Sequence, residues 1–350
     1  MLANNKLYLE DLDQITKVIP SLEKLKNKSV MITGACGMIC SCIVDFLIYL
    51  NDKYQYNINV YAFVRPKDHV EVRFKSYIDR SDFHHVLYNA LLDLETNEHF
   101  DYMIHGASNV SSESFMKEPV ETMLANFVGL NNLLDYARFY KTERVLYIST
   151  SEVYGNKEEQ SAYKEDDYEF LDILKTRACY PSSKRASETL AVSYSYEYDV
   201  DTVMVRPGHV YGPTMSPFDT RAASQFAKDV LDGHDIIMKS SGQQLRSHCY
   251  VVDCVSAILT VLLNGEKAKA YNISNKHSVS TIREIAEAYA KAGNRQVIFD
   301  LPTEEEKASY NMMSNSSLDS TLLESLGWKG VFDLETGTRH TINILNNQEE

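Results

Sequence analysis

Tyr180 and Lys184 are the two residues whose types and spacing most directly indicate chemistry in this sequence. A separation of four places both side chains on one face of a helix, which we predict to begin at Pro181, a residue tolerated in the first turn. An ammonium beside a phenol favours the phenolate, so Lys184 is expected to lower the pKa of Tyr180. Tyr180 is therefore a candidate proton donor or acceptor near neutral pH, although the spacing alone also fits an ordinary surface pair.

A glycine-containing turn, GACGMIC (34–40), lies between a predicted apolar strand and a predicted helix. This is the context of a dinucleotide-binding turn, in which glycines let the backbone approach the pyrophosphate and the helix N-terminus donates N–H groups. The residues assigned to this contact are Gly34, Gly37, Met38 and Ile39. Cys40 stands where a third glycine is usual, which puts the close packing of helix on strand in question.

A second strand, INVYAFV (58–64), runs into Arg65 and Lys67. An acidic residue at this point would bind the ribose hydroxyls of NAD(H), whereas two basic residues suit the 2′-phosphate of NADP(H). We therefore favour NADP(H) over NAD(H), with a solvated basic loop as the alternative. Asp93 and Leu94 follow another apolar run and are predicted to line the adenine pocket, although an ordinary turn explains Asp93 almost as well.

Strand-like and helix-like segments alternate over the first two thirds of the chain, which predicts an α/β fold with a Rossmann-type, doubly wound parallel sheet. Strands are expected at 28–33, 58–64, 100–106, 144–150 and 201–207, and helices at 119–140 and up to Tyr198. Further helices are expected near 220–232, 251–264 and 281–292. We divide the chain into a helical extension (1–27), a dinucleotide-binding domain (28–205) and a smaller α/β substrate lobe (206–350), parts of which return to the first domain.

Length, composition and net charge limit the classes of molecule that this chain is expected to bind. A length of 350 residues with 44% hydrophobic residues suits one large unit or two closely packed domains. A net charge of −14 argues against a nucleic-acid binder, so an anionic ligand would need its own basic anchors. We find no apolar stretch of about 18 residues that predicts a membrane span, and the N-terminus does not read as a signal peptide.

None of the six cysteines forms a CxxC pair. We therefore expect neither a metal site nor disulfides, and a reducing, cytoplasmic location.

The strand RVLYIST (144–150) continues into SEVYG (151–155). Because the carboxyl ends of parallel strands face the ligand crevice, Thr150, Ser151 and Glu152 should project towards a substrate.

Several short motifs now occur in a characteristic order. They are TGACGMIC (33–40), HGAS (105–108), Asn126, STSEVYG (149–155), YPSSK (180–184), RPGHVYGP (206–213), Arg221, RSHCYVVD (246–253) and LGW (326–328). From Ser29 to Trp328 the chain resembles the extended short-chain dehydrogenase/reductase family of NAD(P)-dependent nucleotide-sugar epimerases and dehydratases. Its motifs are most similar to those of UDP-glucuronate decarboxylases.

The resemblance implies roles at the redox centre. Tyr180 would act as acid and base at the sugar 4-oxygen, Lys184 would hold the nicotinamide ribose, and Thr150 would hydrogen-bond the same sugar oxygen. Ala107, Ser108 and Asn126 would contribute to cofactor binding.

On the substrate side, Arg221 and Arg246 would clamp the nucleotide diphosphate, a task suited to planar guanidinium groups. His209 stands where relatives carry an asparagine that touches substrate. We regard His105, Cys249 and most of the tyrosines as packing residues.

Glu152 bears on which reaction occurs. Dehydratases of the family use such a glutamate as a base at C5, commonly beside an aspartate, and here Ser151 occupies that place. Thr-Ser-Glu resembles both UDP-glucuronate decarboxylases and GDP-mannose 4,6-dehydratases, and the Arg177–Tyr180 segment followed by Lys184-Arg185 resembles the decarboxylases more.

Two alternatives stay open at this point. His209 and the basic loop after the second strand also fit an NADPH-dependent reductase of a nucleotide-linked ketose or keto sugar, for example in capsule or teichoic-acid precursor synthesis. A catalytically silent binding protein is a second alternative, against which Thr150, Tyr180 and Lys184 argue. The resemblance further implies a homodimer that packs through the helices at 119–140 and 180–198.

Overall fold

The computed structural model describes residues 2–66, 68, 70–108, 112–157, 161–300 and 315–347, without the side chains of 112–114. Its centre is a seven-stranded sheet in the order β10-β6-β5-β4-β1-β2-β3, and all neighbouring strands are parallel. The strands are β1 (Ser29–Thr33), β2 (Asn59–Val64), β3 (Phe83–Leu87), β4 (Tyr102–His105), β5 (Arg144–Ile148), β6 (Thr202–Pro207) and β10 (Lys269–Ile273). The predicted Rossmann-type sheet is confirmed.

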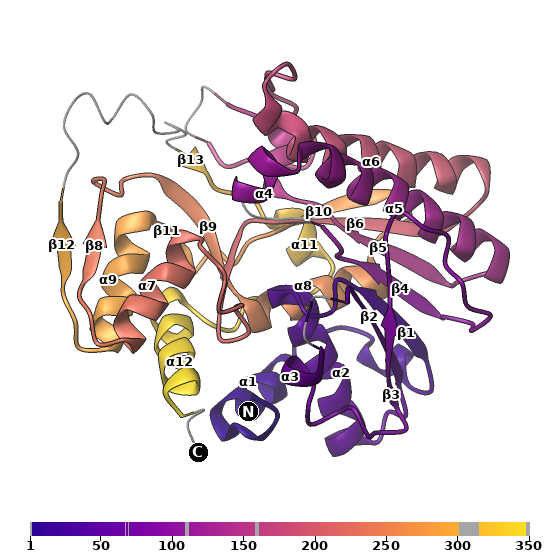
Figure 1. Cartoon of the computed structure of the whole chain (residues 1–350), viewed down its shortest axis with the longest axis horizontal. Coiled ribbons are helices and arrows are strands. Elements are labelled where there is room, and N and C mark those ends of the chain that lie inside the picture. The colour runs from indigo at the N-terminus through magenta and orange to yellow at the C-terminus, as the bar shows by residue number, and fades with distance from the viewer. Residues whose placement is uncertain are drawn as a thin grey trace.

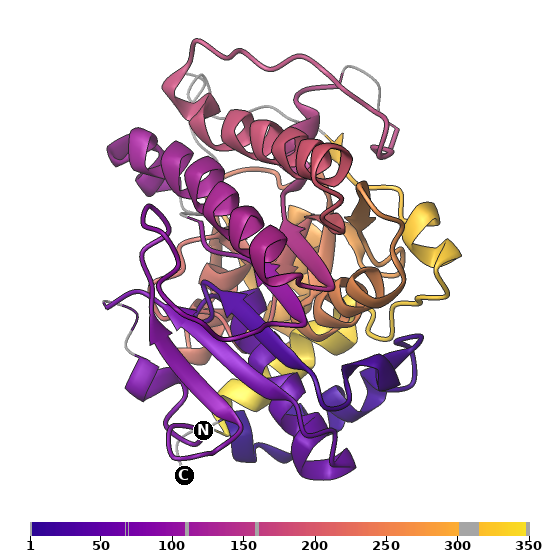
Figure 2. The same ribbon diagram turned by 90° about the vertical axis from the view of Figure 1, so that its right-hand side faces the viewer.

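Helices cover both faces of the sheet. One face carries α5 (Pro119–Tyr140) and α6 (Cys179–Glu197), and the other carries α2 (Met38–Tyr54) and α8 (Val251–Asn264) (Figure 1). Both faces need covering because apolar side chains of β1 point to each of them. Val30 and Ile32 pack on the side of α2 and α8, whereas Met31 packs on the side of α5 and α6. Figure 2 shows the α5–α6 pair above the strands and the indigo N-terminal helices below them.

The helix that carries Tyr180 begins two residues earlier than predicted. A 3-10 turn, η4 (Thr176–Ala178), leads directly into α6 at Cys179, so Pro181 is the third helical residue. Proline is tolerated there because the first N–H groups of a helix have no partner within the helix. Tyr180 and Lys184 remain one turn apart on the same face.

The smaller lobe is built on β9 (Leu245–Tyr250), which pairs with β7 (His209–Tyr211), β11 (Val279–Thr281) and β13 (Asn315–Ser316). A separate pair consists of β8 (Ile236–Met238) and β12 (Val297–Phe299). Helices α7 (Ala222–Leu231), α9 (Ile282–Ala292), α11 (Thr321–Ser325) and α12 (Leu334–Asn346) complete this part. Although β10 comes from the last third of the chain, it joins the main sheet, and the domain boundaries given above remain a proposal.

The N-terminal extension contains η1 (Leu2–Asn4), α1 (Lys6–Ile15) and η2 (Leu22–Leu25). Buried acceptors tie α1 to both parts of the molecule. The Tyr8 hydroxyl donates to Asp45 of α2 at 2.9 Å, and the buried carboxylate of Asp11 accepts from Tyr250 and contacts His340, each at 2.8 Å. Within the described ranges, no helix has both the length and the apolar character needed to cross a membrane.

A buried ion pair links the helix of Tyr180 to the strand that leads into the smaller lobe. Arg206 at the end of β6 is 2% exposed, and its Nη2 and Nε lie 2.6 and 3.0 Å from the carboxylate of Glu188 on α6. The same guanidinium donates to the Tyr154 hydroxyl at 3.0 Å. Tyr154 ends η3 (Ser151–Tyr154), the turn that follows β5, and donates in turn to Asn272 of β10. These hydrogen bonds link four elements, namely α6, β6, η3 and β10.

Candidate active site

A cavity of about 2880 Å³ opens at the carboxyl ends of the central strands and extends under the smaller lobe. Pockets for one small molecule usually measure about 300–1,000 Å³, so this cavity has room for two sizeable ligands side by side. The strand order reverses between β1 and β4, and open α/β sheets bind ligands at such a switch point. Residues from the glycine turn, the end of β5, α6 and the smaller lobe all line it.

The glycine turn has the geometry of a phosphate cradle. Gly34 adopts φ +67°, and a Cβ placed there would lie 2.8 Å from the carbonyl oxygen of Gly106. Gly37 caps α2 without any side-chain cap, which leaves the first-turn N–H groups at Met38 and Ile39 facing the cavity. Such a helix start is a ready anion site.

Cys40 does not prevent close packing of α2 on the sheet. The residue that faces its thiol, just after β4, is a glycine and leaves room for the sulfur. A Cβ at Gly106 would lie 2.3 Å from the Cys40 Sγ, so the absence of a side chain at 106 makes room for the thiol. Cys40 is only 3% exposed. The glycine of HGAS therefore compensates for the missing third glycine of the turn.

The basic loop after β2 is not a simple phosphate site. Arg65 is held by Asp68: the Arg65 amide donates to Asp68 Oδ2 at 2.8 Å, and Arg65 Nη2 lies 2.9 Å from Asp68 Oδ1. Lys67 lies outside the described residues. Asp93 and Leu94 line the same cavity, and their place at the adenine ring stays a prediction.

Among the buried polar atoms of cavity-lining residues, two hydroxyl groups fit a polar ligand such as a dinucleotide. Among the described residues, the Tyr88 hydroxyl near the β2 end and the Ser149 hydroxyl near β5 have no hydrogen-bond partner. Buried polar groups are nearly always paired, so both are expected to bind a ligand or water. Ala107 and Ser108 also line the wall, whereas Asn126 is fully buried and donates to Ser183, which fastens α5 to α6.

At the carboxyl end of β5, the Tyr180 side chain lies beside Thr150 and stacks on Phe115 of α4 (Ser112–Lys117), with ring centroids 4.5 Å apart. Lys184 Nζ donates to the carbonyl of Ile148 at 2.8 Å and lies 4.5 Å from the centre of the Tyr147 ring. Thr150 also caps η3, where its hydroxyl accepts from the Glu152 amide at 3.3 Å. The structure thus brings the sequence-predicted pair and the end of β5 together.

The expected lowering of the Tyr180 pKa by Lys184 is not found. Burial, followed by the charge of Glu152, raises the pKa of Tyr180 above its usual value. Burial lowers the pKa of Lys184 from 10.5 to about 7, opposed by Glu188. Loss of solvation outweighs attraction between the two groups, because Lys184 points to Ile148 and its Nζ is 5.8 Å from the Tyr180 ring centre.

The depressed pKa of Lys184 predicts a pH-dependent stability for the cofactor-free protein. Between pH 7 and 10.5 the unfolded chain keeps the Lys184 proton that the folded protein has lost, so stability rises with pH. The penalty is complete below pH 7 and absent above 10.5. From pH 7.5 to 9, wild type should gain about 1–2 kcal/mol relative to Lys184→Met in urea unfolding. If the free energy of unfolding depended on pH in the same way for wild type and Lys184→Met, the lowered pKa of Lys184 would be contradicted.

His209, Arg221 and Arg246, which were predicted to contact substrate, all line the same cavity. The exposed surface of His209 faces the cavity, and enclosure together with the two arginines lowers its pKa to about 4. His209 is therefore neutral at pH 7 and can donate or accept a hydrogen bond. Arg246 donates to the Leu245 carbonyl at 2.8 Å, which orients its guanidinium.

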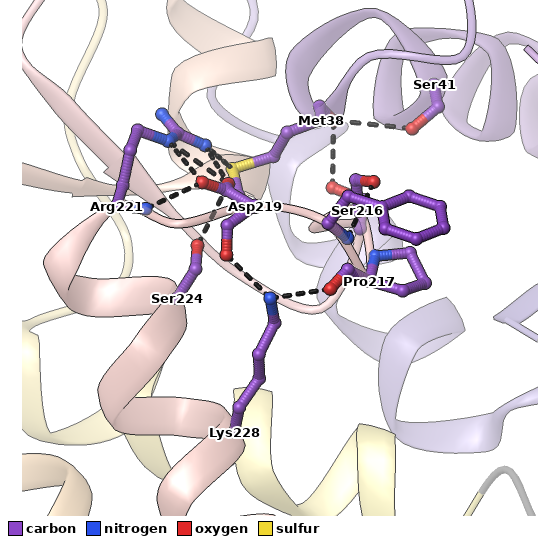
Figure 3. Close-up of polar contacts among 10 residues, drawn as sticks. Met38, Ser41, Ser216, Pro217, Asp219, Arg221, Ser224 and Lys228 are labelled. Atoms are coloured by element: carbon purple, nitrogen blue, oxygen red, sulfur yellow. Dashed lines mark hydrogen bonds and ion pairs between the residues drawn. The ribbon is translucent and has the colours of Figure 1, made fainter. Parts of the chain in front are cut away.

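Arg221 belongs to a loop that closes over the glycine turn (Figure 3). Its guanidinium is held by Asp219 and lies 3.4 Å from the Met38 Sδ, while Thr214 donates to the Met38 carbonyl at 2.8 Å. Lys228 of α7 donates to the carbonyls of Pro217 and Asp219 and fixes the loop from below. A diphosphate held by Arg221 would therefore lie next to the glycine turn, which is the expected binding site of the dinucleotide pyrophosphate.

Sequence reasoning missed Arg177 and Phe115 as parts of the site. Arg177 Nη2 lies 2.9 Å from Glu152 Oε1, and the guanidinium lies over the Phe115 ring at 4.7 Å. Ser151 and Glu152 both line the cavity beside them. The Arg177–Tyr180 segment was used only as a family signal, and Phe115 gave no signal because α4 is far from both residues in sequence.

Residues 30–274 match the family model described as the NAD dependent epimerase/dehydratase family. UDP-glucuronic acid decarboxylase 1 of Xenopus tropicalis is 27% identical over 94% of this chain and 75% of its own length. UDP-glucuronic acid decarboxylase 6 of Arabidopsis thaliana is 30% identical over 75% of this chain and 73% of its own length.

Solved structures share the fold. UDP-glucose 4-epimerase of Thermotoga maritima, solved with UDP-glucose, superposes with a TM-score of 0.77 at 19% identity, covering 92% of this chain and 100% of that one. UDP-glucuronic acid 4-epimerase of Bacillus cereus, solved with UDP-glucuronic acid and NAD, gives 0.75 at 20% identity, covering 91% and 98%.

Proposed function

Because the chain belongs to the NAD-dependent epimerase/dehydratase family, we propose that it modifies a nucleotide sugar and that its reaction is the decarboxylation of UDP-glucuronate. The observation that carries this proposal is the meeting of Tyr180, Thr150 and Glu152 on one cavity wall, with Arg177 paired to Glu152 at 2.9 Å. The curated relatives quoted above support the choice of reaction.

The chain's own residues would divide the work as follows. The glycine turn and the first turn of α2 would hold the pyrophosphate of a dinucleotide, whose nicotinamide supplies reversible two-electron oxidation of a carbinol. Tyr180 would take the proton of the sugar 4-hydroxyl and return it at the end, while Thr150 holds the same oxygen. Arg221 and Arg246 would fix the substrate diphosphate.

With a ketone at C4, the bond from C5 to the carboxylate is weakened, because its electrons can pass into an enolate as CO2 leaves. C5 then needs a proton. Glu152 lines the cavity wall next to Tyr180, and we propose that it delivers the proton to C5. Enclosure by Phe115 and the smaller lobe would limit access of water to the reactive ketone.

For the cofactor we propose NAD(H). The preference for NADP(H) read from Arg65 and Lys67 is not supported, since the matched family is NAD-dependent and the Arg65 side chain is already engaged by Asp68. A 2′-phosphate would have to displace that carboxylate or lie against it, whereas a ribose diol can donate to it.

We therefore expect Asp68→Asn to move the ratio of the NADP+ and NAD+ dissociation constants towards NADP+ by about tenfold, as loss of a like charge allows. Titration of the purified variant with each dinucleotide measures the ratio. An unchanged ratio would place the ribose away from Asp68.

The raised pKa of Tyr180 favours one other function. A phenol that stays protonated is a better donor than acceptor, which suits reduction of a ketone in a nucleotide-linked keto sugar or ketose. In that case the cofactor would be consumed in proportion to product.

The proposed reaction is tested by incubating the protein with UDP-glucuronate and a catalytic amount of NAD+, followed by mass spectrometry of the nucleotide sugars. Decarboxylation yields a UDP-pentose. Conversion to a UDP-hexuronate isomer would indicate a 4-epimerase instead, and no change with UDP-glucuronate together with oxidation of a reduced dinucleotide by a keto sugar would indicate the reductase.

We also propose a homodimer and a cytoplasmic location. The outer sides of α5 and α6 expose a band of apolar side chains, namely Val120, Met123, Leu124, Phe127, Val192 and Tyr196. Exposed apolar side chains at helical spacing on two helices that pack together favour association with a second copy. Sedimentation velocity on the purified protein distinguishes the dimer from the monomer.

A further inference from the structure

Arg177 presents a cation at the reactive end of the cavity, apart from the arginines assigned to the diphosphate. It precedes α6 on η4, whereas Arg221 and Arg246 come from the smaller lobe. The Arg177 side chain is 42% exposed, and it lines the cavity together with Tyr180 and Glu152. Its charge is among those that act on the Tyr180 hydroxyl.

Aromatic stacking fixes where this cation lies. The Arg177 guanidinium covers one ring at 4.7 Å, that of Phe115, and Phe115 stacks on Tyr180 at 4.5 Å with an interplanar angle of 18°. Stacking holds a guanidinium plane in place while its N–H edge stays available. Glu152 accepts from one nitrogen of this edge, Nη2.

The proposed function places C4 of the sugar at Tyr180 and Thr150, so the first atom of the substituent on C5 must lie two bonds from C4. In a uronic acid this substituent is a carboxylate, and in an ordinary hexose it is a hydroxymethyl group. A planar guanidinium binds a carboxylate through two parallel hydrogen bonds, which a hydroxymethyl group cannot match.

We propose that Arg177 is the carboxylate-binding residue of this site and that it selects nucleotide sugars carrying a C6 carboxylate. The inference rests on the proposed function, because it uses the position of C4 at Tyr180. Binding of the carboxylate would share the guanidinium between substrate and Glu152.

The test compares three ligands, UDP, UDP-glucose and UDP-glucuronate, by calorimetry on the NAD+-loaded protein. A Tyr180→Phe background prevents turnover while keeping the aromatic stack on Phe115. Arg177→Met is the test variant. Lys291→Met is the matched control, because Lys291 on α9 is 70% exposed, pairs with Glu335 at 2.7 Å and does not line the cavity.

Arg177→Met should weaken UDP-glucuronate binding at least about tenfold, which corresponds to about 1.4 kcal/mol, and leave UDP and UDP-glucose within about twofold. Lys291→Met should leave the affinity for all three ligands unchanged. Equal weakening of all three ligands by Arg177→Met would mean a structural role only, and unchanged binding of UDP-glucuronate would also overturn the inference. If the background protein binds no UDP ligand, the proposed function itself fails, which is a distinct result.

Discussion

Tyr180→Phe is expected to lower the turnover of UDP-glucuronate by about 10²- to 10⁴-fold, the range contributed by a positioned acid or base. Phenylalanine keeps the ring that stacks on Phe115 but removes the hydroxyl that lies beside Thr150. The loss should therefore appear in kcat, measured from product formation under saturating substrate. Binding of NAD+ should remain within a few-fold of wild type.

Tyr163→Phe is a suitable control for this result. Tyr163 is also a buried tyrosine, but its hydroxyl donates to the Gly155 carbonyl at 3.0 Å, and Tyr163 does not line the cavity. Its loss should affect stability more than kcat. Turnover retained by Tyr180→Phe would remove the phenol from the reaction, whatever the family resemblance.

Arg206→Met is expected to lower the free energy of unfolding by about 3–5 kcal/mol, because it leaves a buried carboxylate without its counter-charge. Arg206 is 2% exposed, and its loss strands Glu188 and removes the donor to Tyr154. Chemical unfolding followed by circular dichroism measures the effect. No surface ion pair of this chain should approach it, since exposed pairs contribute about 0–1 kcal/mol.

The double variant Arg206→Met/Glu188→Gln separates pair loss from cavity formation. Removing the stranded charge should restore part of the lost stability, so the double variant is expected to be more stable than Arg206→Met alone. A double variant that is less stable by the sum of the two single losses would show that the carboxylate is not stranded in the single variant.

Much of the fold could be predicted from the sequence because the central strands are short apolar runs between turn residues. The helix predicted at 119–140 coincides with α5. The bounds of β1, β2 and β5 lie within two residues of the predicted strands 28–33, 58–64 and 144–150. β3 (FHHVL) was not anticipated, because two histidines interrupt its apolar character. β10 was not assigned to the main sheet, since only tertiary pairing with β6 places it there.

In the site, residue types could be predicted but their partners could not. Tyr180, Thr150 and Glu152 are recognisable along the chain, yet the pairing of Glu152 with Arg177 depends on how η4 enters α6. The same holds for Cys40, whose fit depends on a glycine more than sixty residues away. The electrostatic outcome was wrong for a similar reason: burial, which spacing does not reveal, decides the pKa values of Tyr180 and Lys184.

The most direct test of the account measures CO2 release and dinucleotide absorbance in the same reaction with UDP-glucuronate. Internal redox chemistry at C4 predicts that CO2 exceeds the amount of dinucleotide many-fold, while the absorbance of the reduced form shows no net change over the reaction. Absence of CO2, or release that stops once one equivalent of dinucleotide has been reduced, would contradict the proposed cycle.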